Sequence, residues 1–279
     1  MIDTHHHLWH YNPHEYGWID DRMSLLKSDH LAGTLTRLMD ETGVSASVVV
    51  QARQSLAETE WLLQVSEHHP AIAGVVGWVD LCSAAIDEQL SRYAANPKLK
   101  GVRHVVHDEP DDRFMARPDF RLGISKLQLY NLCYDLLLYP RHLELAAVLC
   151  SRFPDQRFIL DHLGKPPIRE GAAEPWKRDL KKLAANPNVA CKLSGMVTEA
   201  NWISWKREDF LPYLDIAWEL FGADRLMVGS DWPVCTLAGD YPTVMSVIPW
   251  YLDLRGVSAS EKEKVLSSNA ERWYLLNIR

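Results

Sequence analysis

The sequence lacks paired cysteines and long apolar runs. Its cysteines are odd in number and none is spaced as CxxC, so they indicate reduced thiols that pack in a core; they are Cys82, Cys133, Cys150, Cys191 and Cys235. No apolar run approaches the roughly 18 residues of a membrane span, and no segment has the pattern of a signal peptide. We therefore expect a cytoplasmic protein with no membrane partner.

Positive charge and nucleotide-binding loops are also scarce. The sequence has 30 Lys and Arg against 37 Asp and Glu, which gives a formal net charge of -7. A nucleic acid or an anionic membrane would require a basic face, so we expect neither as a partner. No GxGxxG follows the first apolar segment and no GxxxxGK[ST] occurs, so the nucleotide-binding folds lose their usual anchors. Small polar or neutral molecules remain as possible ligands.

Short apolar, β-branched segments alternate with longer segments of helical period along the whole chain, as in βαβ units of a parallel sheet. Eight strands with intervening helices predict one (β/α)8 TIM barrel over residues 1–279, and an open doubly wound sheet is the alternative. The expected strands cover residues 1–9, 46–51, 72–79, 99–106, 133–139, 157–163, 189–193 and 225–228. The expected helices cover residues 29–41, 55–69, 83–95, 118–129, 141–152, 176–185, 209–221, 242–254 and 260–276.

Three consecutive histidines stand near the N-terminus. Because a strand turns alternate side chains to the same face, His5 and His7 would point one way and His6 the other. Two converging imidazoles can hold one divalent ion or hydrogen-bond a carbonyl oxygen. The alternative is the remnant of a purification tag or an exposed polar terminus, but a tag is normally longer and outside the fold. Leu8 and Trp9 follow the histidines directly, which favours a place inside the fold.

In a (β/α)8 barrel the active groups lie at the C-terminal ends of the strands. His162 ends the sixth predicted strand and Asp231 ends the eighth, so we expect both to converge with His5 and His7. Arg103 lies late in the fourth predicted strand. It could reach into the same site, or it could brace a loop by a salt bridge.

Other polar residues near strand ends are interpreted differently. Asp161 is out of phase with His162, so we expect Asp161 to cap a neighbouring helix. His104 is out of phase with Arg103 and is expected to face the helices. Ser194 is expected in an ordinary turn.

A long aromatic segment over residues 9–29 follows the first strand and includes Trp18. Loops of this length in compact domains are usually functional, so a wall or lid over a site is one interpretation. A packed surface loop is the other.

Several motifs in order resemble the amidohydrolase superfamily. The opening DTHHH matches the D-x-H-x-H of that superfamily, and FILDHLGKP and LMVGSDWPV resemble the sixth- and eighth-strand motifs of one branch. GVRHVVHDEPDDRFMARPDF, YDLLLYPRHL, CKLSG and SNAERWYLL are similar to the same branch. That branch is the amidohydrolase 2 type, which contains sugar lactonases and dicarboxylate lactonases, and the resemblance spans essentially the whole chain.

The resemblance implies roles for the converging residues. Asp231 would be the general base that activates water, and His5, His7 and His162 would surround the reacting carbonyl or a divalent ion. No histidine occurs in the fifth predicted strand, where metal-rich members of the superfamily supply one, so a binuclear centre is not expected. We expect one zinc on His5, His7 and Asp231, or a reaction with no required metal.

The resulting hypothesis is a hydrolase that opens an aldonolactone such as L-fuconolactone, with Asp231 and His162 as catalytic residues. Fixed donors on Arg103 and Tyr139 would hold the substrate, and Trp18 and Trp232 would offer apolar faces to a sugar ring. The alternatives are a metal-dependent decarboxylase, another hydrolase of the superfamily, and a non-catalytic sugar-binding protein. A monomer and a homo-oligomer are both compatible with the sequence.

Overall fold

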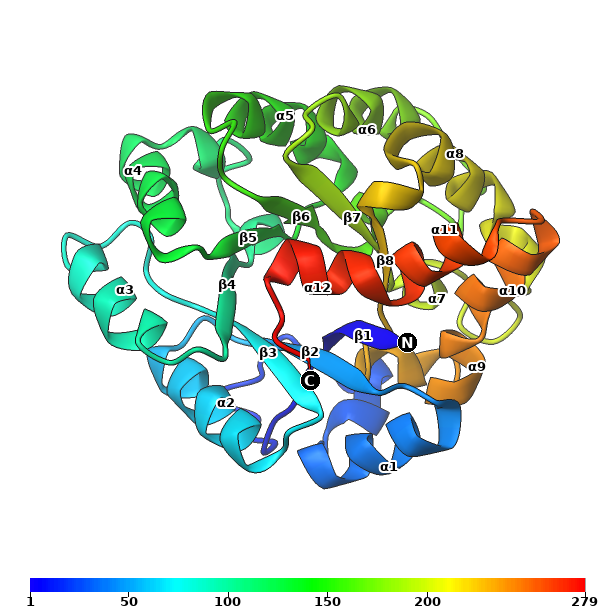
Figure 1. Cartoon of the computed structure of the whole chain (residues 1–279), viewed down its shortest axis with the longest axis horizontal. Helices are drawn as coiled ribbons and strands as arrows, with labels where there is room; N and C mark the ends of the chain where they lie inside the picture. Colours follow the sequence, from blue (N-terminus) through cyan, green and yellow to red (C-terminus); the bar gives the residue numbers. More distant parts are fainter. Residues whose placement is uncertain (279) are drawn as a thin grey trace.

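The structure, a computed structural model, describes residues 1–278. Parallel strands follow one another in sequence order around a single eight-stranded sheet, and helices surround it (Figure 1). The (β/α)8 barrel predicted from the sequence is therefore confirmed. The strands are β1 (Ile2–His6), β2 (Ala46–Val50), β3 (Ile72–Gly77), β4 (Leu99–His104), β5 (Cys133–Leu136), β6 (Phe158–Leu160), β7 (Val189–Leu193) and β8 (Leu226–Val228).

The barrel closes between its first and last strands beyond the end of β8. The His7 amide donates to the Trp232 carbonyl at 2.6 Å, and the Asp231 amide donates to the His5 carbonyl at 2.7 Å. Lower down, the Thr4 hydroxyl donates to the Val228 carbonyl at 2.7 Å. The closure therefore fixes the end of β1 beside the segment that carries Asp231.

The outer ring is built mainly from amphipathic helices, whose apolar faces pack on the sheet. They are α1 (Ala32–Thr42), α2 (Leu56–His68), α3 (Ile86–Ala94), α4 (Pro118–Leu127), α5 (Leu143–Arg152), α6 (Trp176–Ala184), α7 (Met196–Glu199), α8 (Leu211–Phe221), α9 (Tyr241–Met245) and α10 (Val247–Leu254). Gly43 ends α1 with a φ of 69°, a left-handed conformation that glycine adopts without steric cost.

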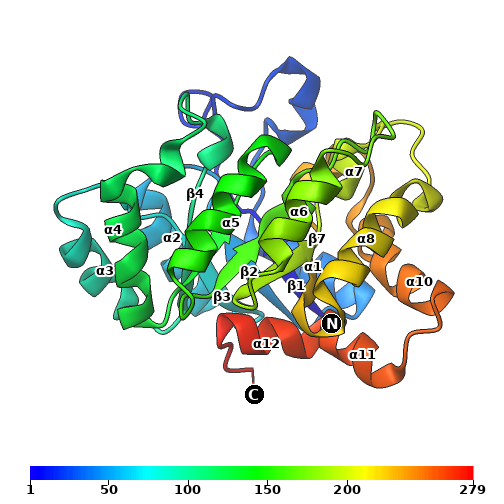
Figure 2. The same ribbon diagram turned by 90° about the horizontal axis from the view of Figure 1, so that it is seen from above.

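The last predicted helix is present and contains a π-helical turn. It consists of α11 (Ala259–Glu263), the π-helical turn Lys264–Ser268 and α12 (Asn269–Tyr274), which follow one another without a gap. Helix α12 lies across the end of the barrel where the strands begin (Figures 1 and 2). Its side chains pack against the apolar lower layer of the barrel interior, which closes that end.

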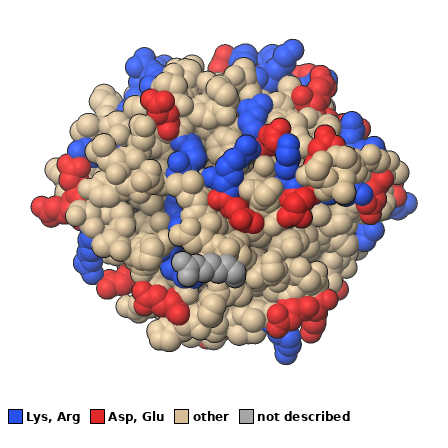
Figure 3. All heavy atoms as spheres, viewed as in Figure 1, with Lys and Arg blue, Asp and Glu red and all other residues tan. Residues whose placement is uncertain are grey.

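The surface on the α12 side carries Lys and Arg as well as Asp and Glu, so it has no field of one sign (Figure 3). No helix in the described part of the chain has both the length and the apolar character needed to cross a membrane.

At the opposite end of the barrel, the segment after β1 rises above the sheet (Figure 2). Trp9, Tyr16, Ile19 and Leu26 are buried and form a small core of their own within this segment. The Trp9 indole N–H donates to the Ser28 carbonyl at 2.9 Å. The segment is therefore a packed loop at the C-terminal end of the strands.

Candidate active site

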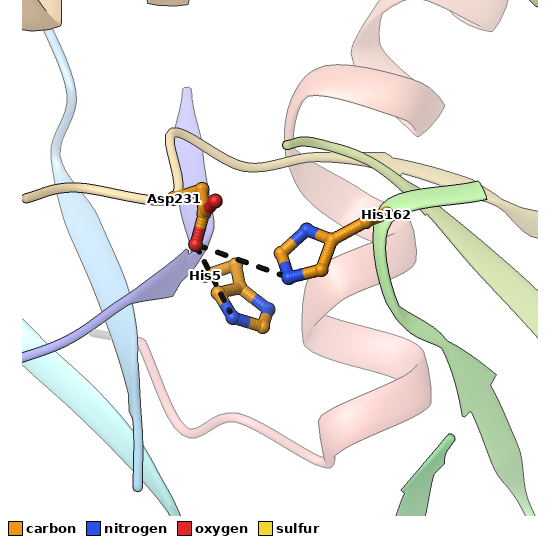
Figure 4. A group of neighbouring side chains, drawn as sticks. All are labelled: His5, His162 and Asp231. Carbon is orange, nitrogen blue, oxygen red and sulfur yellow. Dashed lines mark ion pairs between the residues drawn. The ribbon is translucent and has the colours of Figure 1, made fainter. Parts of the chain in front are cut away.

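The structure brings together the residues that the sequence placed at three strand ends. His5 and His7 lie at the end of β1, His162 follows β6 and Asp231 follows β8. Asp231 Oδ1 lies 3.5 Å from His7 Nε2, 3.8 Å from His162 Nε2 and 3.9 Å from His5 Nε2. His5 and His162 face the Asp231 carboxylate in Figure 4. All four side chains are buried at the C-terminal end of the barrel.

Strand alternation in β1 separates the three histidines as expected. His5 and His7 face Asp231, while the His6 Nε2 lies 3.0 Å from the Ser47 hydroxyl. Below them, the buried Asp3 carboxylate accepts hydrogen bonds from the Ser230 amide at 2.8 Å and the Ser230 hydroxyl at 2.6 Å. This bond between β1 and the end of β8 holds the histidines and Asp231 in one register.

A left-handed turn aims the residues that follow β6. The φ angles are 53° at His162, 54° at Leu163, 70° at Gly164 and 54° at Lys165. Asp231 also has a positive φ, of 60°. Non-glycine residues adopt this conformation at a cost of about 1–2 kcal/mol each, and such residues cluster at functional sites.

The turn explains why the sixth strand was predicted too long. Residues 157–163 were expected to be extended, but β6 ends at Leu160. The fifth strand likewise ends at Leu136 rather than at Tyr139.

The prediction that Asp161 caps a neighbouring helix is wrong. Asp161 is fully buried inside the barrel, and its Oδ1 lies 3.2 Å from His5 Nδ1. The argument from strand phase failed because the chain leaves the extended conformation directly after Leu160. Lys192 Nζ approaches the same nitrogen at 3.1 Å, so the His5 ring is held at its Nδ1 edge while its Nε2 points to Asp231.

The other two imidazoles are also fixed through their second nitrogen. His7 Nδ1 lies 2.8 Å from the Val50 carbonyl and therefore carries the proton, because a carbonyl can only accept. His162 Nδ1 lies 2.9 Å from the Ser194 hydroxyl, so Ser194 contacts a site residue and is not in an ordinary turn. Gly195 allows the close approach: a Cβ there would lie 2.5 Å from His162 Nδ1.

Beneath the histidines lies a buried charge network that the sequence did not predict. Lys192 Nζ lies 2.6 Å from Asp135 Oδ2, 2.9 Å from Asp161 Oδ1 and 3.1 Å from His5 Nδ1. The Tyr274 hydroxyl of α12 donates to Asp135 Oδ2 at 2.7 Å. The network thus connects the lower end of the barrel to a candidate active-site histidine.

Arg103 belongs to the same network. Its Nη1 lies 3.0 Å from Asp161 Oδ2 and 3.2 Å from His5 Nε2, and its Nη2 donates to the Gln51 carbonyl. The side chain is buried, at the base of the site. His104 turns away from it and stacks on Phe114, as strand phase predicted.

Burial sets the protonation states of the site. It lowers the pKa of His162 to about 4 and the pKa of His5 well below its usual value. Burial opposes ionisation of Asp231, but the neighbouring His162 and His7 outweigh it and the pKa of Asp231 is lowered. At neutral pH the site therefore holds an ionised Asp231 carboxylate facing the neutral imidazoles of His5 and His162.

The rim of the site includes residues that the sequence analysis missed. Lys165, at the end of the left-handed turn, lies 3.0 Å from Glu199 Oε1 through its Nζ. The Lys165 ammonium stands over the ring of Tyr139, 5.7 Å from the centroid, and His107 stacks on that ring at 4.7 Å. The only signal in the sequence was the position of Lys165 inside the DHLGKP motif.

The two tryptophans predicted to bind substrate differ in exposure. Trp18 is 37% exposed and meets Trp9 edge-on at 5.8 Å. Trp232 is 3% exposed and packs edge-on against His30 at 5.4 Å. Trp18 therefore has a free face in the packed loop, whereas Trp232 forms part of the wall behind the site.

The donor set fits one divalent ion. Ligand atoms of His5, His162 and Asp231 lie within 4.8 Å of one another. His7 Nε2 lies 3.3 Å from His5 Nε2, so it can contribute to the same position. Nitrogen and carboxylate donors with anchored second nitrogens are typical of zinc sites. The Arg103 guanidinium lies beside His5 Nε2 and repels a second cation there, so we expect the divalent ion to bind weakly.

Comparisons with known proteins identify the family of the chain. The amidohydrolase family model matches residues 2–276. The chain is 39% identical to an L-fucono-1,5-lactonase of Burkholderia multivorans, with 99% of this chain and 96% of the relative covered. It is 34% identical to an L-fucono-1,5-lactonase of Burkholderia ambifaria, with 99% of this chain and 96% of the relative covered.

A solved structure extends the comparison to three dimensions. An amidohydrolase of Burkholderia multivorans, crystallised with bound zinc, matches with a TM-score of 0.95 and 39% identity, and 99% of each chain is covered. The match of the family model over almost the entire length, together with these relatives, establishes that the chain belongs to the amidohydrolase 2 family.

Proposed function

We propose that this protein hydrolyses the lactone ring of a sugar acid, such as L-fucono-1,5-lactone, to the free acid. The observation that carries the proposal is the ionised Asp231 carboxylate at 3.5–3.9 Å from three imidazole Nε2 atoms, at the end of the barrel where such enzymes work. The similarity to two L-fucono-1,5-lactonases supports the substrate class.

Asp231 is suited to move the proton. Its Oδ1 would accept a proton from a water molecule while the water oxygen bonds to the lactone carbonyl carbon. When the ring C–O bond breaks, the same proton passes to the departing ring oxygen, which becomes a hydroxyl group. General base catalysis of this kind typically contributes about 10²–10⁴-fold to the rate.

The histidines divide into two kinds. The rings of His5 and His7 turn their Nε2 atoms to Asp231, so with Asp231 they would hold a zinc ion. When bound, the ion would supply Lewis-acid polarisation of the lactone carbonyl. His162 differs because its partner is a hydroxyl, which can donate or accept. With a lone pair on Nε2, His162 would complete the ligands of the ion, as its place in the donor set allows. With a proton on Nε2 and no ion bound, it would donate to the oxygen on which negative charge develops.

The charges around the site favour a neutral substrate. The cations of Arg103, Lys165 and Lys192 each have a carboxylate partner within 3.0 Å. A carboxylated lactone would therefore have to compete with these carboxylates for the cations, and it would approach an additional negative charge at Asp231. A polyhydroxylated neutral lactone needs only hydrogen bonds. The structure thus favours a sugar lactone over a dicarboxylate lactone.

The test is a pH-indicator assay of the purified protein against a panel of neutral aldonolactones and one dicarboxylate lactone, with and without a chelator. We expect rapid hydrolysis of a subset of the neutral lactones, reduced at least a hundredfold by Asp231→Asn. Asp87→Asn, which changes an exposed carboxylate paired with Lys126, is the matched control and should retain activity. Rates at the spontaneous background for every lactone would overturn the proposal.

A further inference from the structure

We propose that Lys165 and Glu199 together form the subsite that selects a pair of neighbouring hydroxyl groups on the lactone ring. This inference rests on the proposed lactonase function and names the residues that determine its specificity. Lys165 belongs to the turn after β6, and Glu199 belongs to α7, which follows β7. The subsite therefore lies on the strand-end face between the loops that carry His162 and Asp231.

The backbone turn keeps Lys165 beside His162. The Lys165 amide donates to the His162 carbonyl at 2.8 Å, and the two residues have left-handed φ angles of 54° and 53°. Leu163 and Gly164, between them, are buried inside the fold. A turn that holds Lys165 at a φ of 54° carries a strain that an exposed, unconstrained lysine would relieve. Packing of the buried Leu163 holds this turn, so the Lys165 backbone is fixed relative to His162.

The chain itself brings the pair beside the site. Lys165 follows His162 in the turn after β6, and Glu199 ends the helix that begins next to Gly195, whose backbone packs against the His162 ring. Lys165 Nζ lies 3.0 Å from Glu199 Oε1 and 5.7 Å from the centroid of the Tyr139 ring. The pair is thus held next to the loop that carries His162.

The pair presents a donor and an acceptor side by side. Lys165 Nζ has three N–H groups, of which Glu199 uses one, and the Glu199 carboxylate has accepting capacity left. The side chains are 19% and 24% exposed, so each can reach a ligand without leaving the other. One hydroxyl would accept from Lys165 while its neighbour donates to Glu199. Tyr139 lies beneath the ammonium and limits its movement.

Hydroxyl recognition by charged groups is strongly selective. A hydrogen bond to a charged group contributes about 1.5–3 kcal/mol, which corresponds to roughly a tenfold to hundredfold change in kcat/KM. A site built around such groups rejects an analogue that lacks the hydroxyl, because the polar atoms of the site are then left without a partner. The pair would thus discriminate among lactones by the arrangement of their ring hydroxyls.

The experiment compares L-fucono-1,5-lactone with analogues in which one ring hydroxyl is replaced by hydrogen. Lys165→Met and Glu199→Gln should each lower kcat/KM on the parent lactone about tenfold to a hundredfold, chiefly through KM. On the analogue that lacks the recognised hydroxyl, each variant should differ from the wild type by less than about threefold. Lys165→Arg should restore part of the loss. Thermal unfolding of each variant reports whether its fold is intact.

Lys182→Met is the matched control, because it removes a lysine that pairs with Glu144 at 2.7 Å on the outer helices. It should leave kcat/KM unchanged on every lactone. Equal losses for Lys165→Met on all analogues, or no loss on the parent, would overturn the inference while leaving the lactonase proposal intact. If the wild type hydrolyses no lactone, the lactonase proposal fails. Calorimetric binding of L-fuconate then tests the subsite, and affinity unchanged in Lys165→Met overturns it.

Discussion

Replacing Lys192 with methionine should strongly destabilise the barrel. The ammonium group is fully buried and lies 2.6 Å from Asp135 Oδ2 and 2.9 Å from Asp161 Oδ1. The charge-assisted hydrogen bond to Asp135 alone contributes about 1.5–3 kcal/mol. Removing one partner of a buried ion pair typically costs about 3–5 kcal/mol, because the remaining charge stays in a medium of low polarity. We expect Lys192→Met to lower the free energy of unfolding by that amount.

In Lys192→Met the Asp135 carboxylate stays buried without its partner, so neutralising Asp135 should restore part of the lost stability. Burial already raises the pKa of Asp135, against the effect of Lys192, so without the lysine its pKa should rise further. A protonated Asp135 in the folded state gives stability that is lost as the pH rises through its folded pKa. The deficit of Lys192→Met should therefore be smaller at pH 5.5 than at pH 8. Adding Asp135→Asn removes the charge altogether, and Tyr274 can still donate to the amide oxygen.

Urea unfolding followed by tryptophan fluorescence measures both effects. The double variant Lys192→Met/Asp135→Asn should recover about 2 kcal/mol relative to Lys192→Met at pH 8, a coupling of the size expected for groups in direct contact. A loss below about 1 kcal/mol in the single variant would show that the pair contributes little. Additive losses in the double variant would refute the argument that the unpaired carboxylate is the source of the cost.

Three further predictions concern other parts of the fold. Burial raises the pKa of Glu58 from 4.5 to about 7, so its contribution to the free energy of unfolding should fall by about 3 kcal/mol as the pH rises through that range. Glu58→Gln should remove this dependence in urea unfolding at pH 5 and pH 8, and an unchanged pH profile would contradict it. Tyr274→Phe deletes the donor to Asp135 and should cost about 1–3 kcal/mol in the same assay. Gly195→Ala should lower kcat more than tenfold, because Gly195 has a φ of 65° and the new Cβ would lie 2.5 Å from His162 Nδ1. Wild-type activity in this variant would show that the imidazole can move freely.

The barrel could be predicted from the sequence because the patterns that indicate its strands and helices are local. Apolar β-branched segments and helical periods repeat along the chain, and each can be recognised without knowing the others. The pair of His5 and His7 also follows from one strand and its alternation. Asp231 and His162 could be added because barrels place strand ends on one face.

The buried network was harder to predict because its contacts join four different strands and a terminal helix. Lys192 meets Asp135 across the barrel interior, and Tyr274 enters from below. Such contacts depend on the tilt and stagger of the strands, which no single segment encodes. Sequence alone identifies a lysine near a strand end, but it does not show which carboxylates share its cavity.

The left-handed turn after β6 shows why the sixth strand end could not be read correctly. Its non-glycine residues are sterically disfavoured in isolation, so local preference predicts a continued strand. The turn is held instead by tertiary contacts: Leu163 is fully buried, and its carbonyl accepts the Trp176 indole N–H at 2.8 Å. Burial of a leucine contributes about 1.5–3 kcal/mol, comparable to the strain of one or two such residues. Packing against α6 therefore fixes the directions of His162 and Lys165, and the outer helices help to determine the chemistry inside the barrel.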